Sequence, residues 1–220
     1  MSGKISIVIS AYEEEKMIGS VIEGLKKEGY TQIIVVDDAS EDKTAQIARS
    51  KEVKVIQHDQ NRGLGAAIQT GLEEARKQNA DIAVTFDADG QHNPKDIKRL
   101  IEALDGADLA VGVRDRRKMP LNKRLGNYAL DVITHFLGGP LTDSQSGFRA
   151  LGPNALEKIR IKSDRYSVSS EIMIQAKKKD LKLRTIPIEG IFTEYSKASG
   201  TTIASGIRIF FDLLRLKIFL

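Results

Sequence analysis

Short apolar runs rich in β-branched residues alternate with helical patterns through the first half of the chain. This alternation constrains the fold more than any other feature of the sequence. Parallel strands need a crossover connection between them, and that connection is usually a helix, so the pattern predicts an α/β fold with a mostly parallel central sheet. The predicted strands are 4–10, 32–38, 53–58, 81–87 and 108–113, and the predicted helices between them are 13–27, 41–50, 63–78 and 94–104.

The strand–helix rhythm breaks after the fifth strand. The second half predicts helices over 122–137 and 169–179 and a strand over 182–188, without a repeat or a low-complexity linker. A length of 220 residues fits one domain with an elaborated second half. We therefore predict one domain over 1–200 and an amphipathic helix over 201–220. Within the first half, Ser40 has the residue type and position of a helix N-cap.

Composition excludes several classes of protein. The chain is 41% hydrophobic and 29% charged, as expected of a globular domain with a core. It has no cysteine, which excludes disulfides, thiolate zinc sites and a cysteine nucleophile. The N-terminus lacks the pattern of a secretory signal peptide, which predicts a cytoplasmic protein. A net charge of +4 selects no class of partner.

Acidic residues follow three of the predicted strands. Glu13 and Glu14 follow the first, Asp38 follows the second, and Asp87 and Asp89 follow the fourth. In doubly wound sheets ligands bind beyond the carboxyl ends of the strands. Carboxylates that are packed together repel one another, so their convergence at this edge predicts a compensating cation.

The segment FDADGQH (86–92) carries the sharpest chemical signal. Asp87 and Asp89 can reach toward one point from a turn, and the amide of Gln91 can add a neutral oxygen. Such oxygen ligands suit Mg²⁺ or Mn²⁺, whereas three histidines and no cysteine argue against zinc. The alternative is that the aspartates only cap and stabilise a loop.

Two further segments suggest the chemistry of the partners. Residues 114–124 hold six basic side chains and one aspartate, which indicates either a solvated loop or a loop that faces an anion. Residues 207–220 are apolar at ten of fourteen positions, and Arg208, Asp212 and Arg215 form one narrow polar stripe on a helix. This segment is too short to span a bilayer, so it predicts a membrane-interfacial helix or the start of membrane segments. The alternative is packing on the domain or on the partner of a homodimer.

Five ordered motifs together give the chain a family resemblance. They are IVISAYEEE (7–15), IIVVDDASED (33–42), NRGLGAAIQTG (61–71), DADGQHNP (87–94) and DSQSGFRAL (143–151). With them the chain resembles the family 2 inverting glycosyltransferases of GT-A fold, and within these the polyprenyl-phosphate (dolichyl-phosphate) sugar synthases. Departures from the family pattern include Ser10 in place of proline, Glu13 in place of asparagine, and Gly90 in place of leucine.

The resemblance implies roles for individual residues. Ala11, Tyr12, Glu14, Asp38, Asp87 and Lys197 match positions that bind the nucleotide sugar. Asp87, Asp89 and Gln91 match the positions around a divalent metal ion. Asp143, Arg114 and Arg124 match catalytic positions, with the arginines near the phosphates and the acceptor.

The implied activity is metal-dependent, inverting transfer of a sugar from a nucleotide-diphospho-sugar, with GDP-mannose favoured, to polyprenyl or dolichyl phosphate. The enzyme would then be peripheral on the cytoplasmic face of a membrane. One alternative is a UDP-glucose or UDP-N-acetylglucosamine transferase that acts on a saccharide or lipid hydroxyl, with Asp143 as general base. Another is a catalytically inactive, membrane-associated nucleotide-binding scaffold. No aromatic residue interrupts the basic loop, which argues against nucleic-acid binding.

Glycines and histidines have plainer interpretations. Gly63 and Gly65 at a helix start are also found in dinucleotide-binding loops, but Ile68 occupies the position of the third glycine, so we expect them to permit tight helix packing. We expect His58 and His135 to be ordinary surface or helix residues, and His92 to pack within the 86–92 turn.

Overall fold

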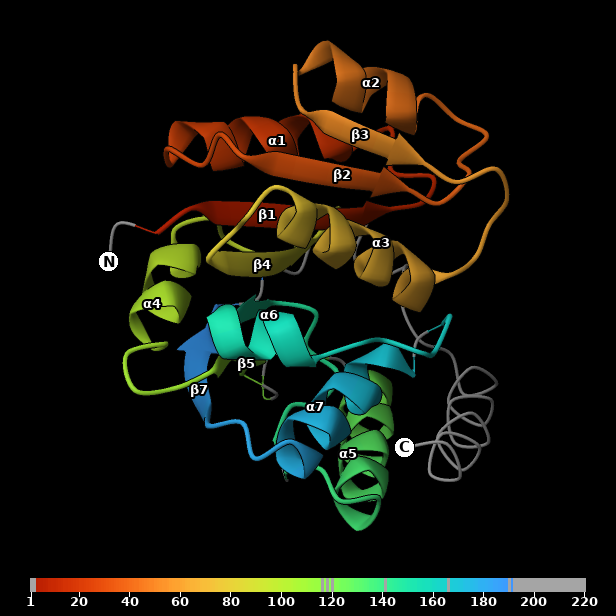
Figure 1. Cartoon of the computed structure of the whole chain (residues 1–220). Coiled ribbons are helices and arrows are strands. Elements are labelled where there is room, and N and C mark those ends of the chain that lie inside the picture. The colour runs from red at the N-terminus through yellow and green to blue at the C-terminus, as the bar shows by residue number, and fades with distance from the viewer. Residues whose placement is uncertain are drawn as a thin grey trace.

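A seven-stranded mixed sheet organises the chain in the computed structural model (Figure 1). The structure describes residues 3–115, 117, 119, 121–140, 142–165, 167–189 and 191. The strand order is β3-β2-β1-β4-β6-β5-β7, and every neighbouring pair is parallel except those that involve β6. The strands are β1 (Ile5–Ala11), β2 (Ile33–Asp37), β3 (Lys54–Gln57), β4 (Ile82–Asp87), β5 (Leu109–Arg114), β6 (Arg149–Leu151) and β7 (Leu183–Ile188).

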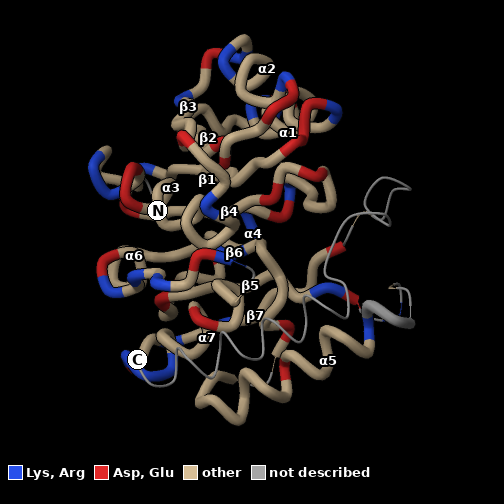
Figure 2. Tube along the Cα trace, turned by 90° about the vertical axis from the view of Figure 1, so that its right-hand side faces the viewer, with Lys and Arg blue, Asp and Glu red and all other residues tan. Residues whose placement is uncertain are grey.

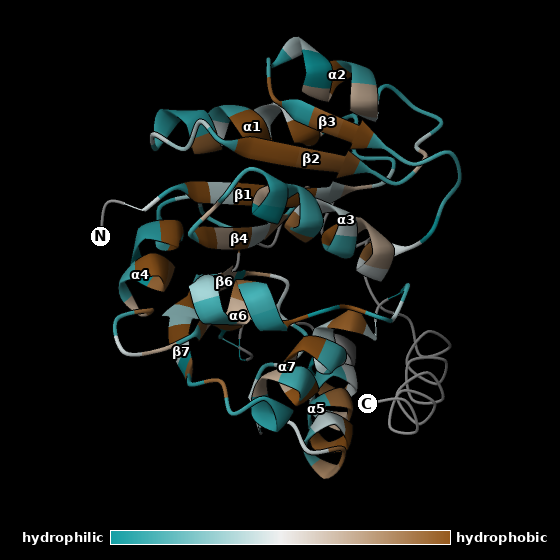
Figure 3. Ribbon diagram, viewed as in Figure 1, coloured by the Kyte–Doolittle hydropathy of each residue, from teal (hydrophilic) through white to brown (hydrophobic). Residues whose placement is uncertain are grey.

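Helices cover both faces of the sheet, which explains why its central strands are apolar on both sides. All five residues of β2 are buried, and Figure 3 shows most of this strand in brown. Side chains from α1, α2 and α4 pack on one face, and side chains from α3, α6 and α7 pack on the other. The helices are α1 (Ile18–Lys27), α2 (Thr44–Ser50), α3 (Leu64–Lys77), α4 (Asp96–Glu102), α5 (Leu121–Phe136), α6 (Pro153–Lys158) and α7 (Val168–Lys178).

The α/β class and the mostly parallel sheet are as predicted. The chain departs from the predicted elements at β6 and α6, which the sequence pattern did not indicate. β6 is three residues long and runs antiparallel between β4 and β5. A strand of three residues is too short to show the alternation of apolar and polar residues that predicts a strand. Its buried position in the sheet depends on partners more than thirty residues away in the sequence.

The prediction that Ser40 caps a helix is wrong. The helix α2 begins at Thr44, and the Ser40 hydroxyl accepts a hydrogen bond from the backbone N–H of Glu13 at 2.9 Å. Ser40 therefore joins the loop after β2 to the loop after β1. This contact helps to hold two strand ends in register at the same edge of the sheet.

The glycines before α3 serve close packing, as predicted. A Cβ at Gly65 would lie 1.9 Å from the carbonyl oxygen of Ser163, and the backbone N–H of Gly65 donates to the carbonyl of Asp164 at 2.8 Å. The first turn of α3 therefore packs directly against the 163–164 loop. Among the described residues, no helix combines the length and the apolar character that crossing a membrane requires.

Candidate active site

The carboxyl ends of four parallel strands define one edge of the sheet. Ala11 at the end of β1 lies beside Asp37 of β2, and Ser10 lies beside Asp87 of β4. Because β6 is antiparallel, its first residue, Arg149, lies at this edge as well. Residues far apart in the sequence therefore meet where nucleotide ligands bind in α/β folds.

Asp38 follows β2 and is 3% exposed. Its carboxylate accepts hydrogen bonds from the backbone N–H groups of Arg62 at 2.9 Å and Gly63 at 2.6 Å, and Oδ1 lies 2.6 Å from Nδ1 of His58. The charge of Asp38 is thus compensated within the protein, where the side chain fixes the loop before α3. The role of Asp38 in nucleotide binding stays a prediction. His58 is 9% exposed and belongs to this network, so its interpretation as an ordinary surface or helix residue is wrong.

The loop after β1 carries three of the predicted nucleotide-binding residues. Ala11 is buried in the sheet, Tyr12 is exposed at 45%, and the backbone N–H of Glu14 donates to Thr44 Oγ1 at 2.7 Å. Glu13 adopts a φ of 54°, a left-handed conformation that asparagine tolerates better than glutamate. The exposed ring of Tyr12 at this edge offers a flat apolar surface that a nucleotide base could contact.

Asp87 lies at the end of β4 and is surrounded by cationic or hydrogen-bonding groups. Its Oδ2 lies 2.8 Å from Nε2 of His92. Burial acts to raise the pKa of the Asp87 carboxyl, but the His92 hydrogen bond and the charges of His92, Arg114 and Arg149 outweigh it, so the pKa is lowered. His92 itself is buried and stacks on Phe148 with ring centroids 4.8 Å apart, which confirms its predicted packing role.

Asp89 has the opposite electrostatic environment. Burial, followed by the negative charge of Asp87, raises the pKa of its carboxyl, and the hydrogen bonds from Gln91 offset only part of this effect. The backbone N–H of Gln91 donates to Asp89 Oδ1 at 3.0 Å, and its side-chain Nε2 donates to Oδ2. Gln91 thus orients Asp89 through its amide nitrogen. Of the two aspartates, Asp89 is the one whose negative charge the surrounding protein leaves undercompensated.

These electrostatics fit a divalent cation at the 87–89 turn. Two carboxylates supply hard oxygen donors, and a cation would offset the burial and the charge of Asp87 that raise the pKa of Asp89. Across the residues that the structure describes, no three histidine, aspartate or glutamate side chains are grouped closely enough to hold an ion. The expected convergence of carboxylates from three strands is therefore wrong. Asp38 is tied to its own loop, and an ion at Asp87 and Asp89 would need oxygens from a ligand or water.

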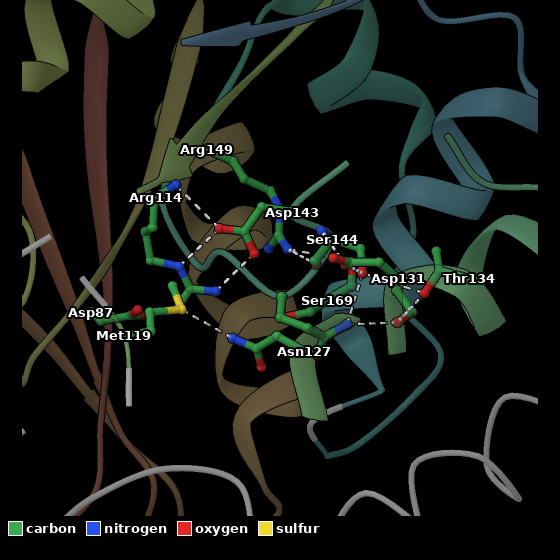
Figure 4. Close-up of polar contacts among 12 residues, drawn as sticks. Asp87, Arg114, Met119, Asn127, Asp131, Thr134, Asp143, Ser144, Arg149 and Ser169 are labelled. Atoms are coloured by element: carbon green, nitrogen blue, oxygen red, sulfur yellow. Dashed lines mark hydrogen bonds and ion pairs between the residues drawn. The ribbon is translucent and has the colours of Figure 1, made fainter. Parts of the chain in front are cut away.

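Asp143 forms a bidentate ion pair with Arg114 (Figure 4). Arg114 Nε donates to Oδ2 at 2.9 Å and Nη2 donates to Oδ1 at 2.8 Å, while Asp143 is 1% exposed. Burial acts to lower the pKa of the Arg114 guanidinium, but the hydrogen bonds and charge of Asp143, with the charges of Asp87 and Asp131, raise it above its ordinary value. Asp143 thus fixes a charged arginine at the end of β5.

Arg149 is a functional-site candidate that the sequence analysis did not assign. It is fully buried, and Nη2 donates to the carbonyls of Ser144 at 2.9 Å and Ser169 at 3.3 Å. Its Nε and Nη1 are buried without a hydrogen-bond partner among the described residues. Burial lowers the pKa of Arg149 to about 10, although the charges of Asp87 and Asp143 oppose the shift. The residue lies within the DSQSGFRAL motif, but a sequence cannot reveal that it is buried.

Gly147 permits the close approach of the 143–149 segment to Asp87. A Cβ at this position would lie 2.5 Å from both carboxylate oxygens of Asp87. The carbonyl of Gly147 also accepts a hydrogen bond from Thr85 Oγ1 of β4 at 2.6 Å. The segment that carries Asp143 and Arg149 is therefore held directly against the predicted metal-binding turn.

One predicted site residue lies apart from this cluster, and another falls outside the described residues. Arg124 is exposed on the first turns of α5. Lys197 and the helix predicted over 201–220 fall outside the described residues. The backbone N–H of Ile191 donates to the carbonyl of Gln91 at 2.9 Å, so the chain passes beside the 87–91 turn six residues before Lys197.

Comparison with known proteins places this arrangement among glycosyltransferases. Residues 6–160 match the family described as Glycosyl transferase family 2. A UDP-N-acetylglucosamine–dolichyl-phosphate N-acetylglucosaminyltransferase of Methanococcus voltae is 43% identical, over 97% of this chain and 96% of the relative. A dolichol-phosphate mannosyltransferase of Pyrococcus furiosus is 32% identical, over 96% of this chain and 64% of the relative.

The fold is also found in a solved structure. Glucosyl-3-phosphoglycerate synthase from Mycobacterium tuberculosis, in complex with Mn²⁺, UDP-glucose and phosphoglyceric acid, superposes with a TM-score of 0.76. The two sequences are 19% identical, and the superposition covers 98% of this chain and 80% of the other. At this identity the likeness establishes the GT-A fold and carries no statement about substrate.

Proposed function

Because the chain belongs to glycosyl transferase family 2 and is a glycosyltransferase, we propose that it transfers one sugar from a nucleotide-diphospho-sugar to the phosphate of a polyprenyl phosphate. In this reaction an acceptor phosphate oxygen forms a bond to the anomeric carbon. The bond from that carbon to the donor diphosphate breaks, and its electron pair leaves with the nucleoside diphosphate. Attack from the face opposite the leaving group inverts the anomeric configuration.

The ion pair between Asp143 and Arg114 is the observation that supports a phosphate acceptor. A hydroxyl acceptor needs a base to take its proton, whereas a phosphate is already an anion at neutral pH. Asp143 is buried and bidentate with Arg114, which suits a residue that positions a guanidinium better than one that removes a proton. A fixed guanidinium at the end of β5 is well suited to an anionic acceptor because it can bind phosphate oxygens in pairs.

On the donor side, Asp87 and Asp89 would hold Mg²⁺ or Mn²⁺. When bound, the cation would supply positive charge to the diphosphate as it leaves. Gln91 orients Asp89, while His92, Arg114 and Arg149 lower the pKa of Asp87. Tyr12, beside the end of β1, would contact the base. These contacts stabilise charge that grows in the transition state more than charge already present in the ground state.

For the sugar donor we propose UDP-N-acetylglucosamine. The support is the name of the Methanococcus voltae relative, which is 43% identical over nearly the whole chain. GDP-mannose, which the sequence analysis favoured, is supported by the less similar Pyrococcus furiosus relative. Both UDP-N-acetylglucosamine and GDP-mannose should therefore be tested as donors. The lipid-linked acceptor would place the enzyme at the cytoplasmic face of a membrane.

A transfer assay with matched acceptors tests this function. The full chain with Mn²⁺ is given UDP-N-acetylglucosamine or GDP-mannose, and either dolichyl phosphate or dolichol of the same chain length. We expect transfer to the phosphate and none to the alcohol. Transfer to the alcohol alone would favour the hydroxyl-acceptor alternative, and no transfer from either donor would favour the inactive scaffold.

Two variants provide the controls for this assay. Asp89→Asn removes the undercompensated charge of the turn and should abolish transfer. Asp105→Asn makes the same chemical change at an exposed position after α4 and should leave transfer unchanged. An equal loss in both variants would mean that the assay reports stability of the fold and not the chemistry of the turn.

A further inference from the structure

The inner side of α5 packs on the body of the protein, with Leu130 buried against Ile174 and with Ile133 and Leu137 partly buried beside them. This side also carries polar residues that bond to the body of the protein. Asp131 accepts hydrogen bonds from the backbone N–H of Ser144 at 2.8 Å and from its hydroxyl at 2.6 Å, and Thr134 Oγ1 lies 2.7 Å from Ser170 Oγ. A helix on an aqueous surface normally buries its apolar side and exposes its polar side.

The outer side of α5 is apolar and exposed. Leu125 is 60% exposed, Tyr128 is 58% exposed and Phe136 is 79% exposed. They account for three of the five large hydrophobic residues that are exposed in the described part of the chain. At 100° per residue these three side chains fall within one narrow stripe, and Ala129 and Val132 lie in the same stripe. We call these five residues the outer face of α5.

The charged residues of α5 differ in exposure. Asp131 is the only carboxylate in the α5 sequence, and it is 1% exposed and accepts a hydrogen bond from Ser144. Arg124 is exposed in the first turns of the helix, at the end of the basic segment 114–124, which holds six basic residues and one aspartate. The tube of α5 is accordingly mostly tan in Figure 2. An apolar stripe flanked by cations is the pattern of helices that lie in the headgroup region of an anionic membrane.

We propose that the outer face of α5 is a membrane-docking surface that inserts into an anionic lipid bilayer. The helix follows β5, whose last residue is Arg114, so docking would bring the acceptor side of the site to the lipid surface. The inference deepens the proposed function, since it names the surface through which this site reaches a lipid-linked acceptor. Burial of Leu125, Tyr128 and Phe136 would supply the apolar part of the binding free energy. The basic segment would supply an electrostatic part, which salt weakens by screening.

Vesicle binding without substrates tests the surface directly. The full chain is sedimented with vesicles of phosphatidylcholine and phosphatidylglycerol in equal parts, and with phosphatidylcholine alone. We expect binding to the anionic vesicles, weakened by salt. The variant Leu125→Ser/Tyr128→Ser/Phe136→Ser should bind at least about tenfold more weakly, as the loss of three apolar contacts requires. The matched control, Leu125→Ile/Tyr128→Phe/Phe136→Leu, keeps the apolar area and should bind like the wild type.

Three results would overturn the proposal. One is unchanged vesicle binding by the serine variant. Another is a wild-type dimer that the serine variant converts to a monomer with no loss of vesicle binding, because the occupant would then be a second copy. The third is stronger vesicle binding after deletion of 206–220 with no effect of the serine substitutions, because that segment would then cover α5.

A separate assay distinguishes failure of this surface from failure of the proposed function. Transfer to a short-chain, water-soluble polyprenyl phosphate requires no membrane, so the serine variant should match the wild type there. With long-chain acceptor in anionic vesicles, the serine variant should be slower by about the factor by which it binds more weakly. Equal loss with both acceptors would contradict a docking role, and absence of transfer by the wild type would count only against the proposed function.

Discussion

At the residue scale, the carboxylates of the site differ in what balances their charge. Asp38 is balanced by two backbone N–H groups and His58, and Asp143 is balanced by Arg114. Asp87 has a lowered pKa because His92, Arg114 and Arg149 outweigh its burial. Asp89 has a raised pKa, first through burial and then through Asp87. A ligand cation therefore has one evident position, beside Asp89.

Asp143 and Arg114 should behave as one functional unit. We expect Asp143→Asn and Arg114→Gln each to lower kcat/KM for a phosphate acceptor by about 100-fold, since the first removes the carboxylate that fixes the guanidinium and the second removes the guanidinium itself. The kcat/KM of the double variant should be no lower than that of the less active single variant. The effects of substituting two residues that act through one contact do not add. Steady-state kinetics of the three variants measure this. A general base at Asp143 would instead make Asp143→Asn far worse than Arg114→Gln, with a further loss in the double variant.

Gly147 should be required for the position of Asp87. In Gly147→Ala the new Cβ would lie 2.5 Å from both Asp87 oxygens, so the carboxylate must move. A displacement on the order of 1 Å can cost about 100-fold in rate, and we expect a loss of at least about tenfold in kcat/KM with the fold retained. The control is Gly126→Ala, where a Cβ meets nothing within 4 Å. Similar kinetics of the two variants would contradict this account of the turn.

The sequence was sufficient to place the acidic residues at one edge but not to identify their partners. Alternating strands and helices put Asp38, Asp87 and Asp89 after strands of a parallel sheet, and the structure has them there. The groups that balance Asp38 come from 58–63, and Arg149 is the first residue of the antiparallel strand β6. Such contacts depend on tertiary packing, which no local pattern reports. This is why the expected convergence of three carboxylates on one cation was wrong.

At the element scale, the short strand β6 joins the two halves of the fold. It pairs antiparallel with β4 and β5, and it follows directly on the segment that carries Asp143 and Gly147. This pairing brings the segment predicted to lie on the acceptor side to the ends of β4 and β5. The regular strand–helix units were predicted to within a few residues at most ends because their apolar patterns are long. β6 and α6 were missed because they are short.

Asp108 supports this junction and should make stability depend on pH. It accepts hydrogen bonds from Asn154 Nδ2 at 2.9 Å and from the backbone N–H of Lys182 at 2.7 Å, just before β5 and β7. The Asn154 hydrogen bond is the largest cause that lowers the pKa of Asp108, and burial only partly opposes it. Because the folded-state pKa is depressed, the stabilisation is present above the ordinary value of 3.8 and is lost as pH falls through the lower folded value.

The variant Asp108→Asn isolates this contribution. At neutral pH it should reduce the free energy of unfolding by about 1 kcal/mol, the typical contribution of one hydrogen bond. The difference from wild type should shrink as pH falls below 3.8, the ordinary pKa. Urea unfolding at several pH values measures it, with Asp105→Asn as the exposed control. A difference that stays constant down to acid pH would show that ionisation of Asp108 contributes nothing.

At the scale of the whole molecule, residues with two different predicted roles lie along one edge of the sheet. The ends of β1, β2 and β4 carry the residues predicted for the nucleotide donor, and β5 with the 143–149 segment carries those predicted for the acceptor. The helix α5 extends from the acceptor side and presents an apolar outer face. The residues predicted for the donor, those predicted for the acceptor and the proposed docking surface thus lie in this order along the molecule, as the proposed reaction between a soluble donor and a lipid-linked acceptor would require.

The most direct test of this account is calorimetric titration of UDP and of GDP into the full chain, with Mn²⁺ and with EDTA. We predict that at least one nucleotide binds the wild type at least about tenfold more tightly with Mn²⁺, the effect of one favourable charge contact. In Asp89→Asn, Mn²⁺ should make no difference to the affinity. Equal nucleotide affinity of the wild type in Mn²⁺ and in EDTA would contradict the claim that the 87–89 turn holds a cation on the donor diphosphate.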